Sequence, residues 1–187
     1  LIAPDGQYRD LNSKAMTDKL QAFVRKGGVL IALENAASAL AANADWGIRV
    51  KESAKVEKAT VQQLVKYADR EKEYLKSSIP GAIYKTYMDE THPLGFGTNG
   101  IYFNLKQDKV LFEPSNSAWN VGSFKKDSYI TGFAGVKAKA ALEEGVVMGV
   151  KQVGAGQVIY MSDDPIFRNF WEAGKLILTN AVFLHGK

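Results

Sequence analysis

The chain has 187 residues and a net charge of +4, from 24 lysines and arginines against 20 aspartates and glutamates, and 46% of its residues are hydrophobic. The basic residues are scattered and form no stripe or reading motif, which argues against nucleic-acid binding. There is no cysteine, so disulfides, cysteine nucleophiles and thiolate metal sites are excluded. No apolar run reaches the roughly 18 residues that a membrane-spanning helix needs, so no membrane span is predicted.

The first 44 residues alternate between strand-like and helix-like segments. LIAP, at residues 1–4, is typical of a buried strand, and we expect a chain that opens inside a strand to be truncated at its N-terminus. A helix is predicted to begin at Asn12 or Ser13 and to end at a glycine pair. The apolar run at 29–34 predicts a second strand, and the small residues at 35–44 predict a second helix. Buried strands joined by helices indicate a parallel sheet.

Residues 49–78 are rich in lysine and glutamate and carry only a narrow apolar stripe. The pattern predicts a charged, solvated helical insertion within the domain, with a partner-binding helix as the alternative.

From residue 79 onwards the pattern is mainly that of β-structure. We predict, in chain order, a strand at 82–88, a hairpin of 101–105 and 110–114, a strand or turn at 128–133, two strands within 144–162 around a GAG turn at 154–156, and a helix at roughly 166–184. Taken together, the segments predict a single α/β domain over residues 1–187. Its sheet is expected to be open, mostly parallel and flanked by helices, with an antiparallel β extension.

Charged residues follow two of the predicted strands at the point where each strand ends. Glu34 closes the run at 29–34, and the pair Asp163 and Asp164 follows the last predicted strand. In open parallel sheets, ligands collect outside the carboxyl ends of the strands. These carboxylates either face one crevice or cap the helices that follow them. Arg168, which lies among aromatic residues, is expected to bridge to Asp163 or Glu34, or else to clamp a ligand carboxylate.

A second candidate cluster follows the strand predicted at 82–88. Asp89, Glu90 and His92 could form a small metal or acid–base site. The alternative is a turn in which Asp89 caps backbone amides. The second histidine, His185, is 93 positions away, and neither histidine has the spacing of a metal ligand, so no metal and no cofactor are predicted.

Several ordered segments together carry a resemblance to a known family. They are APDGQYRDLN, LQAFVRKGGVLIALENAA, IPGAIYKTYMDETHPLGFG, GQVIYMSDDPIFRNFW and GKLILTNAVFLHG. They resemble the class I glutamine-amidotransferase-like, flavodoxin-like domain at the C-terminus of bacterial zinc-carboxypeptidase-like proteins. The resemblance implies a secreted or periplasmic protein whose partner is an upstream peptidase-like domain of the same polypeptide.

Active members of the wider amidotransferase superfamily carry a cysteine after a central strand and a histidine after a late strand. In this sequence Glu34 or Asn35 stands at the first position, and Ser162, Asp163 or Asp164 stands at the second. A carboxylate cannot form the thioester that glutamine hydrolysis needs. The chain also lacks the histidine and glutamate pattern of a zinc carboxypeptidase. The resemblance therefore implies that no catalytic residue is present.

The leading functional prediction is a non-catalytic accessory domain of a zinc-carboxypeptidase-like protein, which packs, positions substrate or binds a peptide or glycan. The candidate ligand-binding residues are Glu34, Asp89, His92, Asp163 and Arg168.

Two alternatives belong to other functional classes. The first is a divergent hydrolase that uses Glu34, Asp163 and His92 in the crevice. The second is a carbohydrate-binding module, for which Trp46, Trp119 or Tyr102 would have to be exposed for stacking on sugars.

Overall fold

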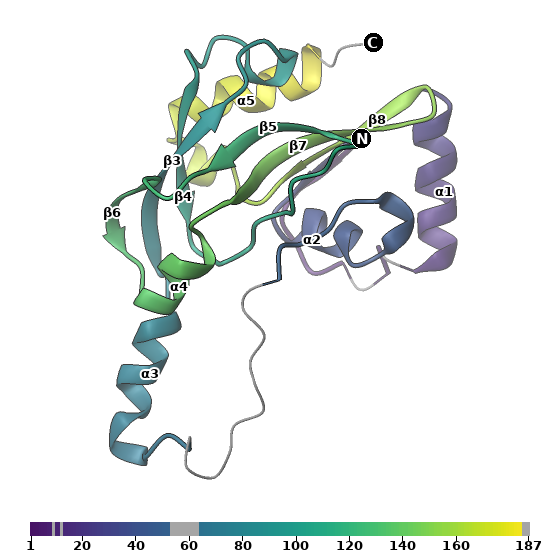
Figure 1. The fold of residues 1–187 in the computed structure, drawn as a ribbon. Coiled ribbons are helices and arrows are strands. Elements are labelled where there is room, and N and C mark those ends of the chain that lie inside the picture. The colour runs from purple at the N-terminus through teal and green to yellow at the C-terminus, as the bar shows by residue number, and fades with distance from the viewer. Residues whose placement is uncertain (9, 12, 53–63, 185–187) are drawn as a thin grey trace.

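The computed structural model describes residues 1–8, 10–11, 13–52 and 64–184, and its strands form one eight-stranded sheet (Figure 1). The strands are β1 (Ile2–Ala3), β2 (Val29–Leu33), β3 (Gly81–Met88), β4 (Ile101–Lys106), β5 (Trp119–Phe124), β6 (Tyr129–Phe133), β7 (Gly145–Val153) and β8 (Gly156–Met161). Their order in the sheet is β1-β2-β8-β7-β5-β3-β4, and β6 pairs with β3.

The described residues also form five α-helices and several short 3₁₀ turns. The helices are α1 (Lys14–Arg25), α2 (Asn35–Ala41), α3 (Arg70–Ser77), α4 (Val136–Ala141) and α5 (Glu172–Phe183). The 3₁₀ turns are η1 (Ala44–Trp46), η3 (Tyr67–Asp69), η4 (Pro93–Gly95) and η5 (Phe167–Asn169). No helix in the described part of the chain is both long and apolar enough to span a membrane.

The predicted open, mostly parallel sheet is wrong, because the sheet is mixed and mostly antiparallel. Only β1 with β2 and β2 with β8 pair in parallel among the described strands. The pairs β8–β7, β7–β5, β5–β3, β3–β4 and β3–β6 are all antiparallel. One physical reason is the short connection between β7 and β8, which reverses the chain through Gly154 and Ala155. A two-residue turn can join only antiparallel strands.

The sheet is strongly curled. Along the sheet order, three strands separate β4 from β8. In a flat sheet with strands about 4.8 Å apart, β4 and β8 would lie roughly 19 Å apart. Yet Lys106, the last residue of β4, reaches Asp163 just after β8, with Nζ 2.7 Å from Oδ1. The curl therefore brings the far edge of the antiparallel strands over the end of the parallel strands.

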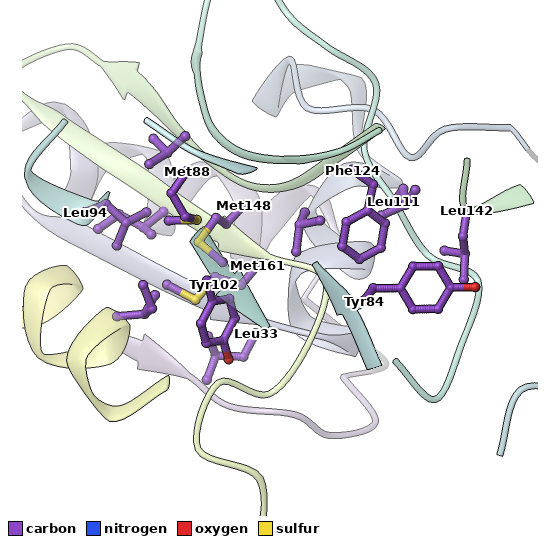
Figure 2. Packing of buried hydrophobic residues seen from close by; sticks show 14 of the residues in the cluster. Leu33, Tyr84, Met88, Leu94, Tyr102, Leu111, Phe124, Leu142, Met148 and Met161 are labelled. Atoms are coloured by element: carbon purple, nitrogen blue, oxygen red, sulfur yellow. The ribbon is translucent and has the colours of Figure 1, made fainter. Parts of the chain in front are cut away.

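Two hydrophobic clusters lie on opposite faces of β2 and β8. Leu30 and Val158 pack with α1 and α2, whereas Ile31 and Ile159 belong to the cluster on the other face. Figure 2 shows that second cluster, in which Met88, Met148 and Met161 lie near Tyr102 of β4, and the rings of Tyr84 and Phe124 stack in another part of it. Burial on both faces explains why β2 and all of β8 except Gln157 are built from apolar residues, glycine and tyrosine.

The structure confirms several predicted elements. Ser13 caps α1, because its hydroxyl accepts a hydrogen bond from the N–H of Met16 at 3.3 Å; Asn12 lies outside the described residues. The strands predicted at 1–4, 29–34, 82–88 and 128–133 correspond to β1, β2, β3 and β6. The first of them is not buried as predicted, because Leu1 and Ile2 are 62% and 46% exposed. The two strands around the GAG turn are β7 and β8.

Other predicted elements are wrong in pairing or length. Residues 110–114 do not form a hairpin with 101–105, because β4 pairs with β3 and Phe112 bridges to Val50 and Val146. The final helix α5 begins at Glu172 rather than near 166, because Arg168 and Asn169 have left-handed backbone angles, with φ of 48° and 58°. Of the charged segment at 49–78, residues 53–63 lie outside the described residues, and α3 follows them.

Candidate functional site

The carboxyl ends of β2 and β8 bring together two of the predicted site segments. Glu34 follows β2 and Asp164 follows close behind β8, and the N–H of Asp164 donates to Oε1 of Glu34 at 3.0 Å. The N–H of Glu34 donates to the carbonyl of Met161 at 2.9 Å. The two strand ends therefore meet at one edge of the sheet, as the parallel pairing of β2 and β8 requires.

Glu34 has an unusual backbone, with φ 46° and ψ −115°. A non-glycine residue in such a sparsely populated conformation costs roughly 1–3 kcal/mol. Glu34 immediately precedes α2, but its side chain caps no N–H of that helix. Instead, Oδ1 of Asp5 accepts hydrogen bonds from the first residue of the helix, Asn35, from its backbone N–H at 3.4 Å and from its Nδ2 at 2.8 Å. A helix-capping role for the Glu34 carboxylate is therefore wrong.

The Glu34 carboxyl is half-buried, and burial raises its pKa from 4.5 to about 7. The nearby negative charges of Asp5 and Asp163 raise the pKa further, and the hydrogen bond from the N–H of Asp164 opposes them. A carboxyl with a pKa near neutrality takes up or releases a proton in the physiological range. Glu34 thus differs in chemistry from an ordinary surface glutamate.

Asp163 occupies a different environment, although it is next to Asp164 in the chain. It is buried, and its Oδ2 accepts hydrogen bonds from Nδ2 of Asn104 at 2.7 Å and from the hydroxyl of Ser162 at 3.0 Å. Its Oδ1 forms an ion pair with Nζ of Lys106 at 2.7 Å. Because three donors hold it and it is closed off from solvent, Asp163 is a structural carboxylate.

Lys106 is the most buried charged side chain of this network. Its ammonium also contacts Oδ1 of Asp108 at 2.8 Å and the carbonyl of Val110 at 2.8 Å. Burial alone would lower the pKa of Lys106, but the carboxylates of Asp163 and Asp108 outweigh it and raise that pKa. Sequence reasoning missed Lys106 and Asn104. The available signal was their alternation along IYFNLK, which places Tyr102, Asn104 and Lys106 on one face of β4.

The cluster predicted around His92 is a capping turn. The Oδ1 of Asp89 accepts from the N–H of Thr91 at 3.0 Å and from its hydroxyl at 2.6 Å. Nδ1 of His92 accepts from the N–H of Leu94 at 3.1 Å, at the start of η4. The hydroxyl of Thr91 lowers the pKa of Asp89, and burial lowers that of His92. These polar groups are thus engaged within their own loop, and the contacts described for His92 do not include Glu34.

Within the described residues, no group of three or more histidine, aspartate or glutamate side chains is placed to hold a metal ion. His185 lies outside the described residues.

Arg168 does not bridge to the carboxylates at the strand ends. Its side chain is exposed, its guanidinium lies over the ring of Phe167 at 5.1 Å, and no ion pair joins it to Glu34 or Asp163, all of which the structure describes. Of the three aromatic residues considered for sugar stacking, Trp46 and Tyr102 are buried. Trp119 is 49% exposed and packs beside His92, with ring centroids 5.7 Å apart.

No protein-family model matches the chain. No curated protein matches it in sequence. Among solved structures, it is similar to a β-galactosidase from Bacillus circulans sp. alkalophilus, with 13% identity and a TM-score of 0.47 over 96% of this chain and 21% of that chain. It is also similar to a ThuA-like protein from Parabacteroides merdae, with 12% identity and a TM-score of 0.49 over 86% of this chain and 58% of that one. An exo-β-1,4-mannosidase from an Opitutaceae bacterium gives 13% identity and a TM-score of 0.40, over 91% of this chain and 23% of that one.

The chain therefore spans about a fifth of the length of the β-galactosidase and the mannosidase. At these identities and TM-scores, the similarities assign no activity. The resemblance to the amidotransferase-like, flavodoxin-like domain of zinc-carboxypeptidase-like proteins is wrong. A flavodoxin-like sheet is parallel, whereas the described strands of this sheet pair mostly antiparallel.

Proposed function

We propose that this chain is a non-catalytic ligand-binding domain, and that Glu34 holds the ligand at the carboxyl ends of β2 and β8. The backbone of Glu34 carries the proposal. Its φ of 46° and ψ of −115° cost roughly 1–3 kcal/mol, and strain of this kind clusters at ligand-binding and catalytic sites. The turn holds a half-buried carboxyl at the carboxyl ends of the two parallel-paired strands β2 and β8.

The neighbouring groups support binding more than catalysis. Asp163 is fully engaged by Lys106, Asn104 and Ser162, and Ser162 is itself buried. Oδ1 of Asp164 accepts from the N–H of Ile166 at 2.9 Å and so holds the turn after β8. Covalent catalysis requires a nucleophile with an adjacent base. With these side chains engaged, the described residues at this edge of the sheet offer no such pair.

The accessible groups at this edge are hydrogen-bond acceptors. Asp5 is exposed, Glu34 and Asp164 are half-buried, and all three are carboxyls. Burial, and after it the negative charge of Asp5, raises the pKa of Glu34, and a positively charged ligand would offset that negative charge. The ligand class that fits best is therefore a peptide that presents an ammonium group.

The experiment is a titration with the tripeptide Gly-Lys-Gly, followed by NMR, with Gly-Gln-Gly as the uncharged control and maltotriose as a glycan probe. We expect Gly-Lys-Gly alone to bind, to bind more tightly at pH 8 than at pH 6, and to lose at least about tenfold in affinity in Glu34→Gln. Binding that is unchanged in Glu34→Gln, or that is seen only with maltotriose, would contradict the proposal.

A second measurement tests the strain itself. Both Glu34→Gly and Glu34→Ala remove the carboxyl, but only glycine relieves the backbone. Glycine also loses more conformational entropy than alanine on folding, which offsets part of this relief. We therefore expect the free energy of unfolding of Glu34→Gly to be about 1–2 kcal/mol higher than that of Glu34→Ala. Equal stabilities of the two variants would show that the turn is not strained.

One observation favours a hydrolase as the second candidate. A carboxyl with a pKa of about 7 has the value of a general acid or base at neutral pH. A panel of nitrophenyl glycosides and fluorogenic peptides separates the two functions. Turnover by the natural chain that disappears in Glu34→Gln would establish the hydrolase and overturn the non-catalytic proposal.

A further inference from the structure

Two adjoining surface hollows lie on the side of the sheet that carries α2, and the lining residue nearest to Glu34 in the chain is Ser38, one helical turn further on. Their volumes are about 530 Å³ and 340 Å³, and Arg49 and Glu113 line both of them. The larger hollow is also lined by Ser38, Ala41, Ala42, Val50 and Glu52. The smaller one is also lined by Gly47, Pro114, Ser115, Asn116 and Ser117. Both volumes are in the range of small-molecule sites, which is roughly 300–1,000 Å³.

Arg49 and Glu113 face each other across a short antiparallel pair of segments. The N–H of Glu113 donates to the carbonyl of Arg49 at 2.9 Å, and Val50 bridges to Phe112. Residues opposite each other in such a pair have Cβ atoms about 4.5–5.5 Å apart on the same face. Opposite charges in this position ordinarily form an ion pair. The structure describes both side chains, and no contact of 4.0 Å or less joins Arg49 to Glu113.

The wall of the smaller hollow is fixed in place before any ligand binds. Asn120 accepts from the N–H of Ser115 and donates to its carbonyl, both at 3.0 Å. The hydroxyl of Ser117 accepts from Nζ of Lys151 at 2.5 Å. A preformed wall lowers the ordering cost of binding, because the loop has little freedom left to lose.

We propose that Arg49 and Glu113 form a binding site for a small zwitterion of the α-amino acid type. The guanidinium pairs with the ligand carboxylate through two parallel hydrogen bonds, and the Glu113 carboxylate accepts from the ligand ammonium. The zwitterion thus satisfies both charges at once, which a simple anion or a neutral sugar cannot do. This site is independent of the function proposed for Glu34.

The larger hollow is the place for the ligand side chain. Besides Arg49 and Glu113 it is lined by Ala41, Ala42 and Val50, which offer an aliphatic ligand side chain apolar surface, and the carboxylate of Glu52 disfavours an acidic one. The smaller hollow presents hydroxyl and amide groups instead. We therefore expect L-valine to bind more tightly than glycine.

The test is calorimetric titration of the whole chain with L-valine, N-acetyl-L-valine and L-valinamide. The acetyl derivative lacks the ammonium and the amide lacks the carboxylate. We expect saturable binding of L-valine in the millimolar range and at least about tenfold weaker binding of each derivative. Arg49→Gln and Glu113→Gln should each weaken L-valine binding by at least about tenfold, and Arg49→Lys, which keeps the charge but loses the fork, should be intermediate.

The matched controls are Lys14→Gln and Asp18→Asn, an exposed pair of opposite charges on α1, and both should leave L-valine binding unchanged. Thermal melting of each variant shows whether it is folded. Absence of L-valine binding up to about 10 mM, or equal binding of N-acetyl-L-valine, would overturn the proposal. A loss of L-valine binding in Glu34→Gln would place the ligand at the other site and also overturn it.

Discussion

The parallel and antiparallel regions of the sheet differ in the polarity of the side chains that their strands bury. In the parallel region, β2 and β8 are apolar on both faces and are covered on both. In the antiparallel region, β4 buries Asn104 and Lys106, whereas Ile101 and Phe103 on its other face are each 44% exposed. Asp163, at the end of the parallel region, forms an ion pair with Lys106 and accepts a hydrogen bond from Asn104, and so helps to stabilise the polar face of β4. One buried charge pair thus joins the two regions.

The largest expected effect comes from breaking that charge pair. Lys106→Met keeps the length and the apolar stem of the side chain but leaves Asp163 buried without its cation. Removing one partner of a buried ion pair costs about 3–5 kcal/mol, because the remaining charge is uncompensated. We expect the free energy of unfolding, measured with guanidinium chloride, to fall by that amount.

The matched control is the double variant Lys106→Met with Asp163→Asn, in which no charge is left unpaired. It should recover more than half of the loss, and it keeps the test interpretable if Lys106→Met alone does not fold. A loss of less than about 1 kcal/mol in Lys106→Met would mean that the curl of the sheet does not depend on this pair.

The second prediction concerns Glu34, which lies at the same edge of the sheet as Asp163 but, unlike Asp163, forms no ion pair with another residue that the structure describes. Because the pKa of Glu34 is raised to about 7 in the folded chain, the folded state holds this proton to a higher pH than the unfolded state does. The stabilising contribution is therefore complete below pH 4.5 and is lost as the pH rises to about 7. For a half-buried group screened by solvent, we expect the loss to be on the order of 1–2 kcal/mol.

The measurement is the free energy of unfolding of the natural chain and of Glu34→Gln between pH 4 and pH 8. Taking the difference between the two proteins at each pH removes the contributions of Asp89, His92 and the other titrating groups that do not interact with Glu34. Glu34→Gln should gain stability relative to the natural chain as the pH rises. A difference that stays constant with pH would show that the pKa of Glu34 is ordinary.

The two regions also differ in how well the sequence predicts them. A strand buried on both faces is an uninterrupted apolar run, so β2 and β8 were predictable, and their parallel pairing explains why Glu34 and Asp164 meet. The direction of β3, β4 and β5 depends on pairings far apart in the chain, which local pattern does not encode. The alternation in β4 places Asn104 and Lys106 together on one face, but it would assign the other face, with the apolar residues Ile101 and Phe103, to the core. The sequence therefore groups Lys106 and Asn104 without indicating that they are buried against Asp163.

The smallest expected effect concerns the outer edge of the antiparallel region, where β4 is the last strand of the sheet. Nε1 of Trp171 donates to the carbonyl of Phe103 at 2.8 Å, and so covers a backbone group that no strand pairs with. Trp171→Phe keeps an aromatic ring but removes the donor, and it should lower the free energy of unfolding by about 0.5–1 kcal/mol. Phe170→Leu, at a neighbouring exposed position without such a bond, is the control and should change stability less. The exposed carbonyl also becomes available for pairing with another chain, so Trp171→Phe should associate more readily, which light scattering measures. If both the stability and the scattering signal are unchanged, Trp171 does not protect this edge.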